Sequence, residues 1–251
     1  MKRFVWFTFI AHLNCSGPEP DPMVIDLDLG AAIVDMPADG VGAPADSGAG
    51  GDDELLDQGL PVSWSVWNTY YYLASEADYA GVDDTTLFGP DCEPIAEVPA
   101  AYSDAVCIEG SGILEDGTVI NYASRCDCGR PCPTGGIVCW KALDPATHPF
   151  GEGAFGNALV PMRSLAVDRA EIPLRTSIYL PKFDGIEVPS LGGVEGFVHD
   201  GCFRADDVGG AIDGEHVDIF AGPEVMWRHF EGVFPTRTEF DAYLNADTCM
   251  R

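Results

Sequence analysis

The sequence predicts a small all-β barrel, and three observations support this fold class. Runs rich in β-branched and aromatic residues are short, and they alternate with turns built on glycine and proline, of which the chain has 29 and 19. Segments with a helical period are few. The 251 residues are 46% hydrophobic, which is enough to fill a core, so we expect one folded domain with a tail.

The N-terminal residues are typical of an export signal. Lys2 and Arg3 precede an apolar stretch, residues 4–13, that is too short to span a bilayer, and Cys15 follows shortly after it. We expect residues 1–14 to be a lipoprotein-like signal peptide and Cys15 to be the lipidated first residue of an exported protein of the cell envelope, at the outer membrane or in the periplasm. The residues just before Cys15 are larger than is usual at a lipidation site, so plain secretion is the alternative.

Residues 15–60 have the composition of an acidic disordered linker. They contain no Lys or Arg, and like charges extend such a chain between a lipid anchor and a folded domain. The formal net charge of the whole chain is −28, which repels phosphate backbones, so we expect no nucleic acid as a partner. The linker's eleven acidic residues are Glu19, Asp21, Asp26, Asp28, Asp35, Asp39, Asp46, Asp52, Asp53, Glu54 and Asp57.

Cysteine usage also favours export. Beyond Cys15 the chain has eight cysteines, and an even number in an exported protein predicts four disulfides. We expect Cys202 to pair with Cys249, because that bridge would tie the C-terminus to the barrel. The crowded cysteines of residues 126–139 could hold zinc instead, but their spacing fits no common zinc pattern and no His lies among them, so we expect no metal and no cofactor. The eight cysteines are Cys92, Cys107, Cys126, Cys128, Cys132, Cys139, Cys202 and Cys249.

The folded domain is expected over residues 61–251, starting with a strand at 64–73. Strand alternation places Trp67, Thr69 and Tyr71 on one face of this strand. One face should fill the core, and the other could contact sugar rings. The further elements expected are a helix at 96–105, a hairpin turn at Asp116-Gly117, a strand at 118–122, a disulfide-pinned insertion at 124–150, and helices at 225–230 and 236–245.

Three aspartates lie on or beside strand-like segments in the last third of the chain. Asp168 follows Ala166-Val167, and Asp218 interrupts the β-branched run from Val217 to Phe220, where an Asp is a poor strand former. A glycine turn separates Asp207 from Asp218. That arrangement can bring both carboxylates to one cleft, where one of them would hold a proton near neutral pH.

These segments resemble the three-aspartate (3D) domain of the membrane-bound lytic murein transglycosylase A type and of stationary-phase cell-wall enzymes. The resemblance covers roughly residues 160–222. It implies a six-stranded double-psi β-barrel with short helices and disulfide-pinned loop insertions. It also implies a peptidoglycan lytic transglycosylase, which cleaves the MurNAc–GlcNAc β-1,4 bond and closes an anhydro ring without consuming water. The matching segments are Ala166-Val167-Asp168 with Ile172-Pro173-Leu174, residues 207–212, and residues 214–220.

The resemblance assigns catalytic roles to the three aspartates. Asp218 matches the family's acid/base, and Asp207 is the second carboxylate, which would raise the pKa of Asp218 and bind substrate. Asp168 would shape the cleft or orient a neighbour, although an Asp before a turn often bonds local N–H groups instead. The candidates for substrate binding are Thr69, Tyr70, Gly209, Gly210 and His216.

Two departures from the family pattern put the substrate details in question. Asp213 and Arg175 stand where the family often has Lys and Gly, and no second domain that would close the glycan groove is evident. The alternative function is therefore a non-catalytic, expansin-like protein that binds cell-wall glycan. In both cases the expected partner is the peptidoglycan glycan strand, the membrane is contacted only through a lipid anchor, and the protein is a monomer.

Overall fold

The computed structural model describes residues 62–249. The predicted signal peptide, the lipidation site at Cys15 and the acidic linker lie outside the described residues. Among the residues from 62 to 249, no helix is both long and apolar enough to cross a membrane.

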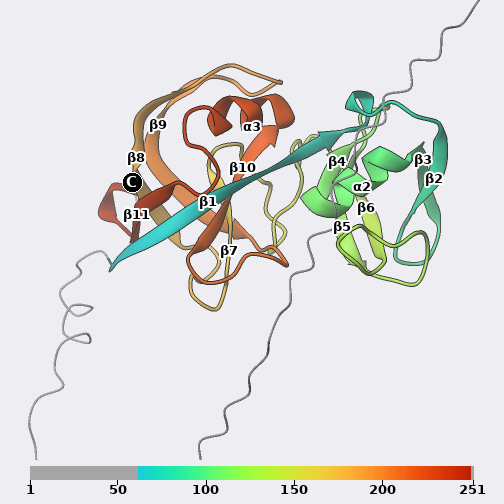
Figure 1. The fold of residues 1–251 in the computed structure, drawn as a ribbon, viewed down its shortest axis with the longest axis horizontal. Coiled ribbons are helices and arrows are strands. Elements are labelled where there is room, and N and C mark those ends of the chain that lie inside the picture. Colours follow the sequence, from blue (N-terminus) through green and yellow to red (C-terminus); the bar gives the residue numbers. More distant parts are fainter. Residues whose placement is uncertain (1–61, 250–251) are drawn as a thin grey trace, which may run out of the picture. The chain divides into compact units, whose positions relative to one another are not determined.

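Six strands close into a barrel (Figure 1). The pairs β1–β10 and β7–β9 are parallel, and the other four neighbouring pairs are antiparallel. The predicted fold class, a six-stranded double-psi β-barrel, is confirmed. In order around the barrel the strands are β1 (Val62–Ser75), β10 (His216–Pro223), β7 (Ser164–Val167), β9 (Phe197–Asp207), β8 (Ser177–Val188) and β11 (Glu239–Leu244).

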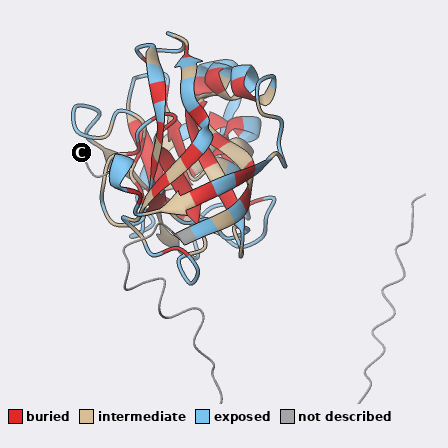
Figure 2. Cartoon of the chain, turned by 90° about the vertical axis from the view of Figure 1, so that its left-hand side faces the viewer, coloured by how far each residue is buried: buried red, intermediate tan, exposed pale blue. Residues whose placement is uncertain are grey.

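An aromatic cluster fills the barrel. Phe183 is fully buried, and its ring contacts those of Phe203, Phe230 and Phe240. Buried residues alternate with exposed ones along the strands (Figure 2). This period of two lets each strand turn one face to the core and leaves the other face for polar side chains.

Residues 83–143 form a second, smaller β unit with a core of its own. In it, β2 (Asp83–Phe88) pairs with β3 (Pro94–Pro99), and β4 (Ser111–Ile113), β5 (Val119–Arg125) and β6 (Val138–Leu143) form a sheet that joins the end of β1 through β4. The turn expected at Asp116-Gly117 and the strand expected at 118–122 lie in this unit as the β4–β5 hairpin, but the sequence did not show that the short strands of residues 83–143 share a core. Its buried core also includes Ala74 from the end of β1, and the other members are Leu87, Val98, Tyr102, Val106, Leu114, Ile120 and Trp140.

The structure contains the four predicted disulfides. The barrel bridge is Cys202–Cys249, as expected. The other three stabilise the second unit and its Cys-rich insertion. The Sγ atoms of Cys126, Cys128 and Cys139 lie close together, but each is oxidised in a bridge and is therefore not a thiolate ligand. The bridges of the second unit are Cys92–Cys128, Cys107–Cys132 and Cys126–Cys139.

The helices differ in part from the sequence predictions. The helix expected at 225–230 is confirmed as α3 (Glu224–Glu231), and the one expected at 96–105 is α2 (Ala100–Glu109), which follows β3. The helix expected at 236–245 is wrong, because Phe240 and Ala242 are buried with a period of two and belong to β11. Two 3-10 turns, η1 (Glu76–Asp78) and η2 (Asp247–Cys249), complete the described elements.

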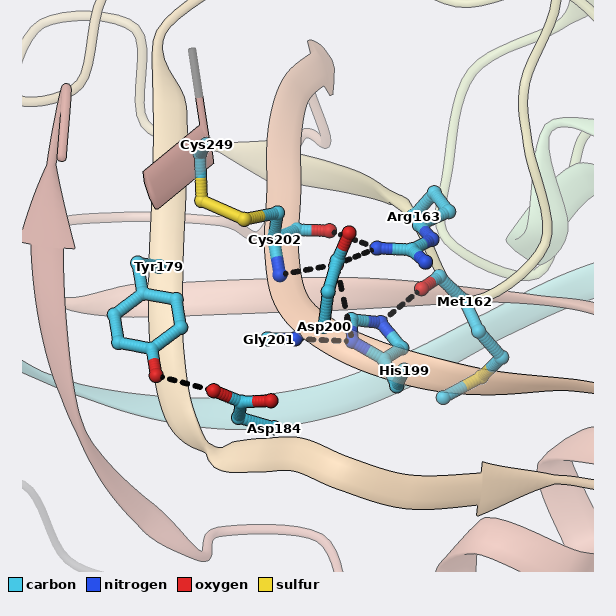
Figure 3. Close-up of polar contacts among 9 residues, drawn as sticks. All are labelled: Met162, Arg163, Tyr179, Asp184, His199, Asp200, Gly201, Cys202 and Cys249. Carbon is cyan, nitrogen blue, oxygen red and sulfur yellow. Dashed lines mark hydrogen bonds and ion pairs between the residues drawn. A yellow bond between two sulfur atoms is a disulfide. The ribbon is translucent and has the colours of Figure 1, made fainter. Parts of the chain in front are cut away.

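A buried histidine anchors the start of β9 (Figure 3). The Nε2–H of His199 donates to the carbonyl oxygen of Met162 at 2.6 Å, and its Nδ1 accepts from the N–H of Gly201 at 2.8 Å. Burial lowers the pKa of His199 to about 4, so the ring is neutral. The carboxylate of Asp200 is paired with Arg163. Both ring nitrogens of His199 are therefore used to hold the backbone.

Candidate active site

The candidate site lies on one register row across four barrel strands. Asp207 on β9 and Asp218 on β10 are both paired with Ala166 of β7, one on each side, and Asp218 is also paired with Thr69 of β1. Residues opposite one another on neighbouring strands point to the same face of a sheet. Two strand spacings, about 10 Å, separate the Cα atoms of the two aspartates. The barrel thus brings together the two carboxylates that lie eleven residues apart in the sequence.

Asp218 is a partly buried carboxyl group with one close partner. The hydroxyl of Thr69 lies 2.6 Å from its Oδ1. Burial raises the pKa of Asp218 to about 6, and the Thr69 contact opposes that rise in part. A group with this pKa can both give and take a proton near neutral pH.

Asp207 is held by its own strand end and by β1. Its Oδ1 accepts from the N–H of Val208 at 2.9 Å, and its Oδ2 accepts from the hydroxyl of Tyr71 at 3.2 Å. Burial, together with the charges of Asp206 and Asp218, raises the pKa of Asp207 to about 7. The sequence led us to expect that Asp207 would raise the pKa of Asp218. In the structure burial is the main cause of the raised pKa at both aspartates, and the charge of Asp218 adds to the rise at Asp207.

Asp168 lies at the end of β7 and holds the glycine turn. Its carboxylate accepts from the N–H of Ala170 at 2.9 Å and from the N–H of Gly214 at 3.1 Å. These bonds lower the pKa of Asp168, so it is ionised. Gly214 has a φ of +59°, a left-handed conformation that favours glycine. Through Gly214, Asp168 fixes the turn that leads into β10, and its catalytic role stays a prediction.

His216 is buried, whereas an exposed ring would be usual for a histidine on a surface strand. Its ring stacks on Trp67 with centroids 3.8 Å apart and planes 8° from parallel. The Nε2 atom lies 2.8 Å from the hydroxyl of Thr69, and Nδ1 lies 3.3 Å from the carbonyl oxygen of Ala211. Burial, with a further contribution from the charge of Arg237, lowers the pKa of His216. The ring is thus held in one orientation directly behind the Thr69–Asp218 contact.

The structure does not bring Tyr70 to the carboxylates. Its ring packs against the barrel core, and its hydroxyl donates to the carbonyl oxygen of Phe234 at 2.8 Å. The neighbouring Tyr71 reaches Asp207 instead. The strand alternation had already placed Tyr71 on the face of Thr69, so this signal was available in the sequence.

The turn between the aspartates is exposed at Gly209 and Gly210. A Cβ atom on Gly209 would lie 2.6 Å from the Cγ1 of Ile212, so glycine lets that side chain fold over the turn. A Cβ on Gly210 would meet nothing within 4 Å. Close approach of a glycan to these two glycines stays a prediction.

Glu109, at the end of α2, is a further acid near the site that the sequence did not single out. Its Oε2 accepts from the N–H of Tyr72 at 2.9 Å. Burial raises the pKa of Glu109 to about 8, and the charges of Asp218 and Glu224 add to the rise. The ring of Tyr72 stacks on that of Trp227 at 5.3 Å between centroids. The second β unit therefore contributes a protonated carboxyl group beside β1, which only the tertiary structure could reveal.

The fold and the site define a double-psi β-barrel protein with two half-buried aspartates on one strand row. Residues 163–240 match the 3D domain family, so the chain contains a 3D domain. This confirms the resemblance seen in the sequence. No curated protein matches the sequence.

Solved structures show where this fold occurs. The fold is similar to that of E. coli MltA with bound chitohexaose, at a TM-score of 0.52 and 19% identity over 79% of each chain. A membrane-bound lytic murein transglycosylase from Agrobacterium tumefaciens also matches, at a TM-score of 0.49 and 14% identity over 78% of this chain and 80% of the other. At such identities we take from the E. coli match the likeness in fold alone.

Proposed function

We propose that this protein is a peptidoglycan lytic transglycosylase that cleaves the MurNAc–GlcNAc β-1,4 bond and leaves an anhydro ring on the muramyl sugar. One observation carries the proposal: Asp218, with a pKa raised to about 6, lies on the same strand row as Asp207 within the 3D domain. A carboxyl group that is protonated under mild conditions is what a glycosidic leaving group requires.

In the first step, protonated Asp218 acts as general acid. Its proton moves to the glycosidic oxygen as the bond from that oxygen to the anomeric carbon breaks. The electron pair of the bond stays with the oxygen, which becomes the hydroxyl of the departing GlcNAc. The muramyl ring passes through an oxocarbenium-like state, and Asp218 is left as a carboxylate beside the Thr69 hydroxyl.

In the second step, the Asp218 carboxylate acts as general base. It takes the proton of the muramyl 6-hydroxyl as that oxygen bonds to the anomeric carbon and closes the ring. No water is consumed, and Asp218 is protonated again. A pKa of about 6 serves both steps, because a much stronger acid would be a poor base and a much weaker acid would be a poor donor.

The other predicted residues support Asp218 in this proposal. Asp207, with its pKa raised to about 7, would donate a hydrogen bond to the sugar while it is protonated. Asp168 would act at a distance, because it holds the turn through Gly214. We retain a substrate contact as a proposal for Thr69, Tyr70, Gly209, Gly210 and His216.

A non-catalytic glycan-binding protein is the second candidate. An open hollow of about 440 Å³, lined by Asp78, Tyr79, Glu224, Val225 and Arg228, offers an aromatic ring and several polar groups to a sugar. Binding there needs no proton transfer. This candidate predicts retention of peptidoglycan without any covalent product.

We also propose a cell-envelope location. Four disulfides favour an oxidising compartment, and lipid anchoring at Cys15 would hold a monomer near peptidoglycan. Labelling with a radioactive fatty acid tests the anchor: wild type should be labelled and Cys15→Ala should not. If wild type is not labelled, the protein is not lipidated and the alternative, secretion without a lipid anchor, takes the place of this proposal.

Product analysis tests the proposed activity. Purified peptidoglycan is digested with the full chain in oxygen-18 water, and the fragments are analysed by mass spectrometry. We expect anhydromuropeptides without the heavy isotope. Released fragments that end in a reducing muramyl sugar in place of the anhydro ring would indicate a hydrolase, and retention of peptidoglycan in pull-downs without any released fragment would indicate the binding protein.

A further inference from the structure

We propose that His216, acting through the hydroxyl of Thr69, controls where the proton of Asp218 resides, and is thus a positioning residue for the acid/base. The proposal about its role in the reaction rests on the proposed function. The proton arrangement itself rests only on geometry.

The hydroxyl of Thr69 lies between two groups that both need it. Its Oγ1 is 2.6 Å from Oδ1 of Asp218 and 2.8 Å from Nε2 of His216. A threonine hydroxyl carries a single proton. It can donate that proton to the carboxyl group or to the imidazole, but not to both at once.

The backbone decides which ring nitrogen of neutral His216 carries the proton. A carbonyl oxygen only accepts, so the contact from the oxygen of Ala211 to Nδ1 requires an N–H at Nδ1. Neutral imidazole has one N–H, so Nε2 is then unprotonated and must accept from Thr69. Stacking on Trp67 keeps the ring plane in place, and a half-turn flip within that plane would carry both nitrogens away from Thr69 and Ala211.

The protonation states of Asp218 and His216 are therefore linked. When Thr69 donates to neutral His216, the close contact with Asp218 is satisfied only if Asp218 carries a proton and donates it to Thr69. When Asp218 is ionised, the Thr69 hydroxyl donates its proton to the carboxylate. The lone pair of His216 Nε2 then faces the lone pairs of Thr69 Oγ1 with no hydrogen between them, which is repulsive. Neutral His216 thus disfavours the carboxylate form of Asp218, and it offsets the stabilisation that the Thr69 hydroxyl would otherwise give that form.

In the proposed reaction, this linkage favours the second step. After Asp218 gives its proton to the glycosidic oxygen, the Thr69 hydroxyl rotates so that it donates to Asp218 and no longer to His216. After Asp218 takes the proton of the sugar hydroxyl, the Thr69 proton rotates back. Because neutral His216 disfavours the carboxylate form of Asp218, it favours transfer of the sugar hydroxyl proton to Asp218. Over the two steps, Asp218, Thr69 and His216 together neither gain nor lose a proton.

Other ionisable groups act on the same cluster and have to be separated from His216. Asp207 and Tyr71 interact with Asp218 from β9 and β1, and Glu109 does so from α2. Arg237, whose guanidinium lies over the ring of Trp67, opposes protonation of His216. A comparison of variants at positions 216 and 69 leaves all of these groups in place.

The test is a double-mutant cycle read by carbon-13 NMR titration of the Asp218 carboxyl group. His216→Phe keeps a ring against Trp67 and removes the acceptor. It should lower the pKa of Asp218 by about half to one unit, the worth of one neutral hydrogen bond. In a Thr69→Val background the same change should have no effect, because the link is gone. Equal shifts in both backgrounds, or no shift in either, would overturn the proposal.

A second measurement needs no variant that could misfold. Nitrogen-15 NMR of the wild-type ring, at a pH where Asp218 is protonated and the ring itself is neutral, should show Nδ1 protonated and Nε2 unprotonated. A proton on Nε2 contradicts the proposal. Thr69→Ser retains the hydroxyl and should preserve both the tautomer and the titration of Asp218. Neither measurement uses catalysis, so a protein that proved inactive could still confirm or refute the linkage.

Discussion

Three aspartates with the same side-chain chemistry acquire different pKa values from their surroundings. Asp218 is raised to a pKa of about 6 mainly by burial, and Asp207 to about 7 by burial plus neighbouring charges. Asp168 has its pKa lowered by two backbone N–H donors. The same residue type thus provides, on one barrel, two candidate proton carriers and one ionised anchor.

The coupling between Asp207 and Asp218 gives a first prediction. Asp218→Asn removes a negative charge that raises the pKa of Asp207, so that pKa should fall below about 7. Carbon-13 NMR titration of the aspartate carboxyl groups measures the change. Thr69 and Tyr71 remain in the variant, so an unchanged titration of Asp207 would mean that the two carboxyl groups do not interact.

Some residues of the candidate site could be predicted from the sequence and others could not. Asp207 and Asp218 could be identified because an aspartate is unusual in an apolar strand, and because the glycines between them mark a turn. Glu109 could not, because nothing in the local sequence of a surface helix shows that its end is buried against β1. Burial of His216 is likewise a consequence of the β1–β10 pairing, in which Trp67 and His216 are partners.

Strand β1 joins the site to both parts of the described fold. Thr69 and Tyr71 contact the two carboxylates from one face of it. Its end pairs with β4 of the second unit, at Ala74 and Ser75. Its strand character was predictable from aromatic and β-branched residues, but its partners were not, because parallel pairing joins segments far apart in the sequence.

The bridge from β9 to η2 gives a prediction about stability. Cys202→Ser with Cys249→Ser removes a cross-link that closes a loop of 47 residues, which should lower the free energy of unfolding by roughly 2–4 kcal/mol. Urea denaturation of wild type and the double variant measures it. Because neither cysteine contacts the carboxylates, activity in the folded variant should stay unchanged. A loss of activity with full stability would contradict this assignment.

The buried His199 gives a prediction about acid stability. Its pKa is about 4 in the folded protein and near 6.5 when unfolded, so the unfolded chain binds more protons between these values. Its contribution is fully present above pH 6.5 and is lost as the pH falls toward 4, by about 3 kcal/mol in all.

Urea unfolding of wild type and His199→Gln across this range tests the prediction. Glutamine can replace part of the hydrogen bonding but does not titrate, so the stability of wild type relative to the variant should decrease as the pH falls from 6.5 to 4. A difference that is constant with pH would show that His199 does not remain neutral in the folded protein.

The second unit contains an acid, Glu109, whose pKa is raised by burial. Glu109 has a pKa of about 8 in the folded protein, so it keeps its proton where an unfolded glutamate would be ionised. The stabilisation from this protonated group is full below pH 4.5 and decreases as the pH rises through 8. The two units are thus joined by a hydrogen bond to Tyr72 that is made by a neutral carboxyl group near neutral pH.

The variant Glu109→Gln tests whether Glu109 is protonated where it accepts the hydrogen bond from Tyr72. Glutamine resembles the neutral acid and retains an acceptor for the N–H of Tyr72. The variant should gain stability relative to wild type as the pH rises from 4.5 to 8, and the difference should then level off. Thermal unfolding at several pH values provides the measurement. If the stability of wild type relative to the variant does not decrease over this range, then the pKa of Glu109 is not raised in the folded protein.

The fold as a whole was predictable only as far as local signals reach. The strand patterns predict a small β-barrel, and the number of cysteines predicts four disulfides. The 3D segment and the double-psi topology were predicted from the resemblance over residues 160–222. The helix expected at 236–245 was wrong because the polar residues there hid a period of two. A turn and one strand of the second unit were predicted, at Asp116-Gly117 and 118–122, but the pattern in its short strands is too weak to predict that residues 83–143 share a core.

The most direct test of the central claim is the yield of anhydromuropeptides from Asp218→Asn. The variant keeps the shape of Asp218 and removes its titratable proton, so the full chain carrying it should release no anhydro product while its circular dichroism matches wild type. Asp184→Asn, an exposed aspartate bonded to Tyr179, is the matched control and should release as much as wild type. Full release by Asp218→Asn would show that Asp218 is not the acid.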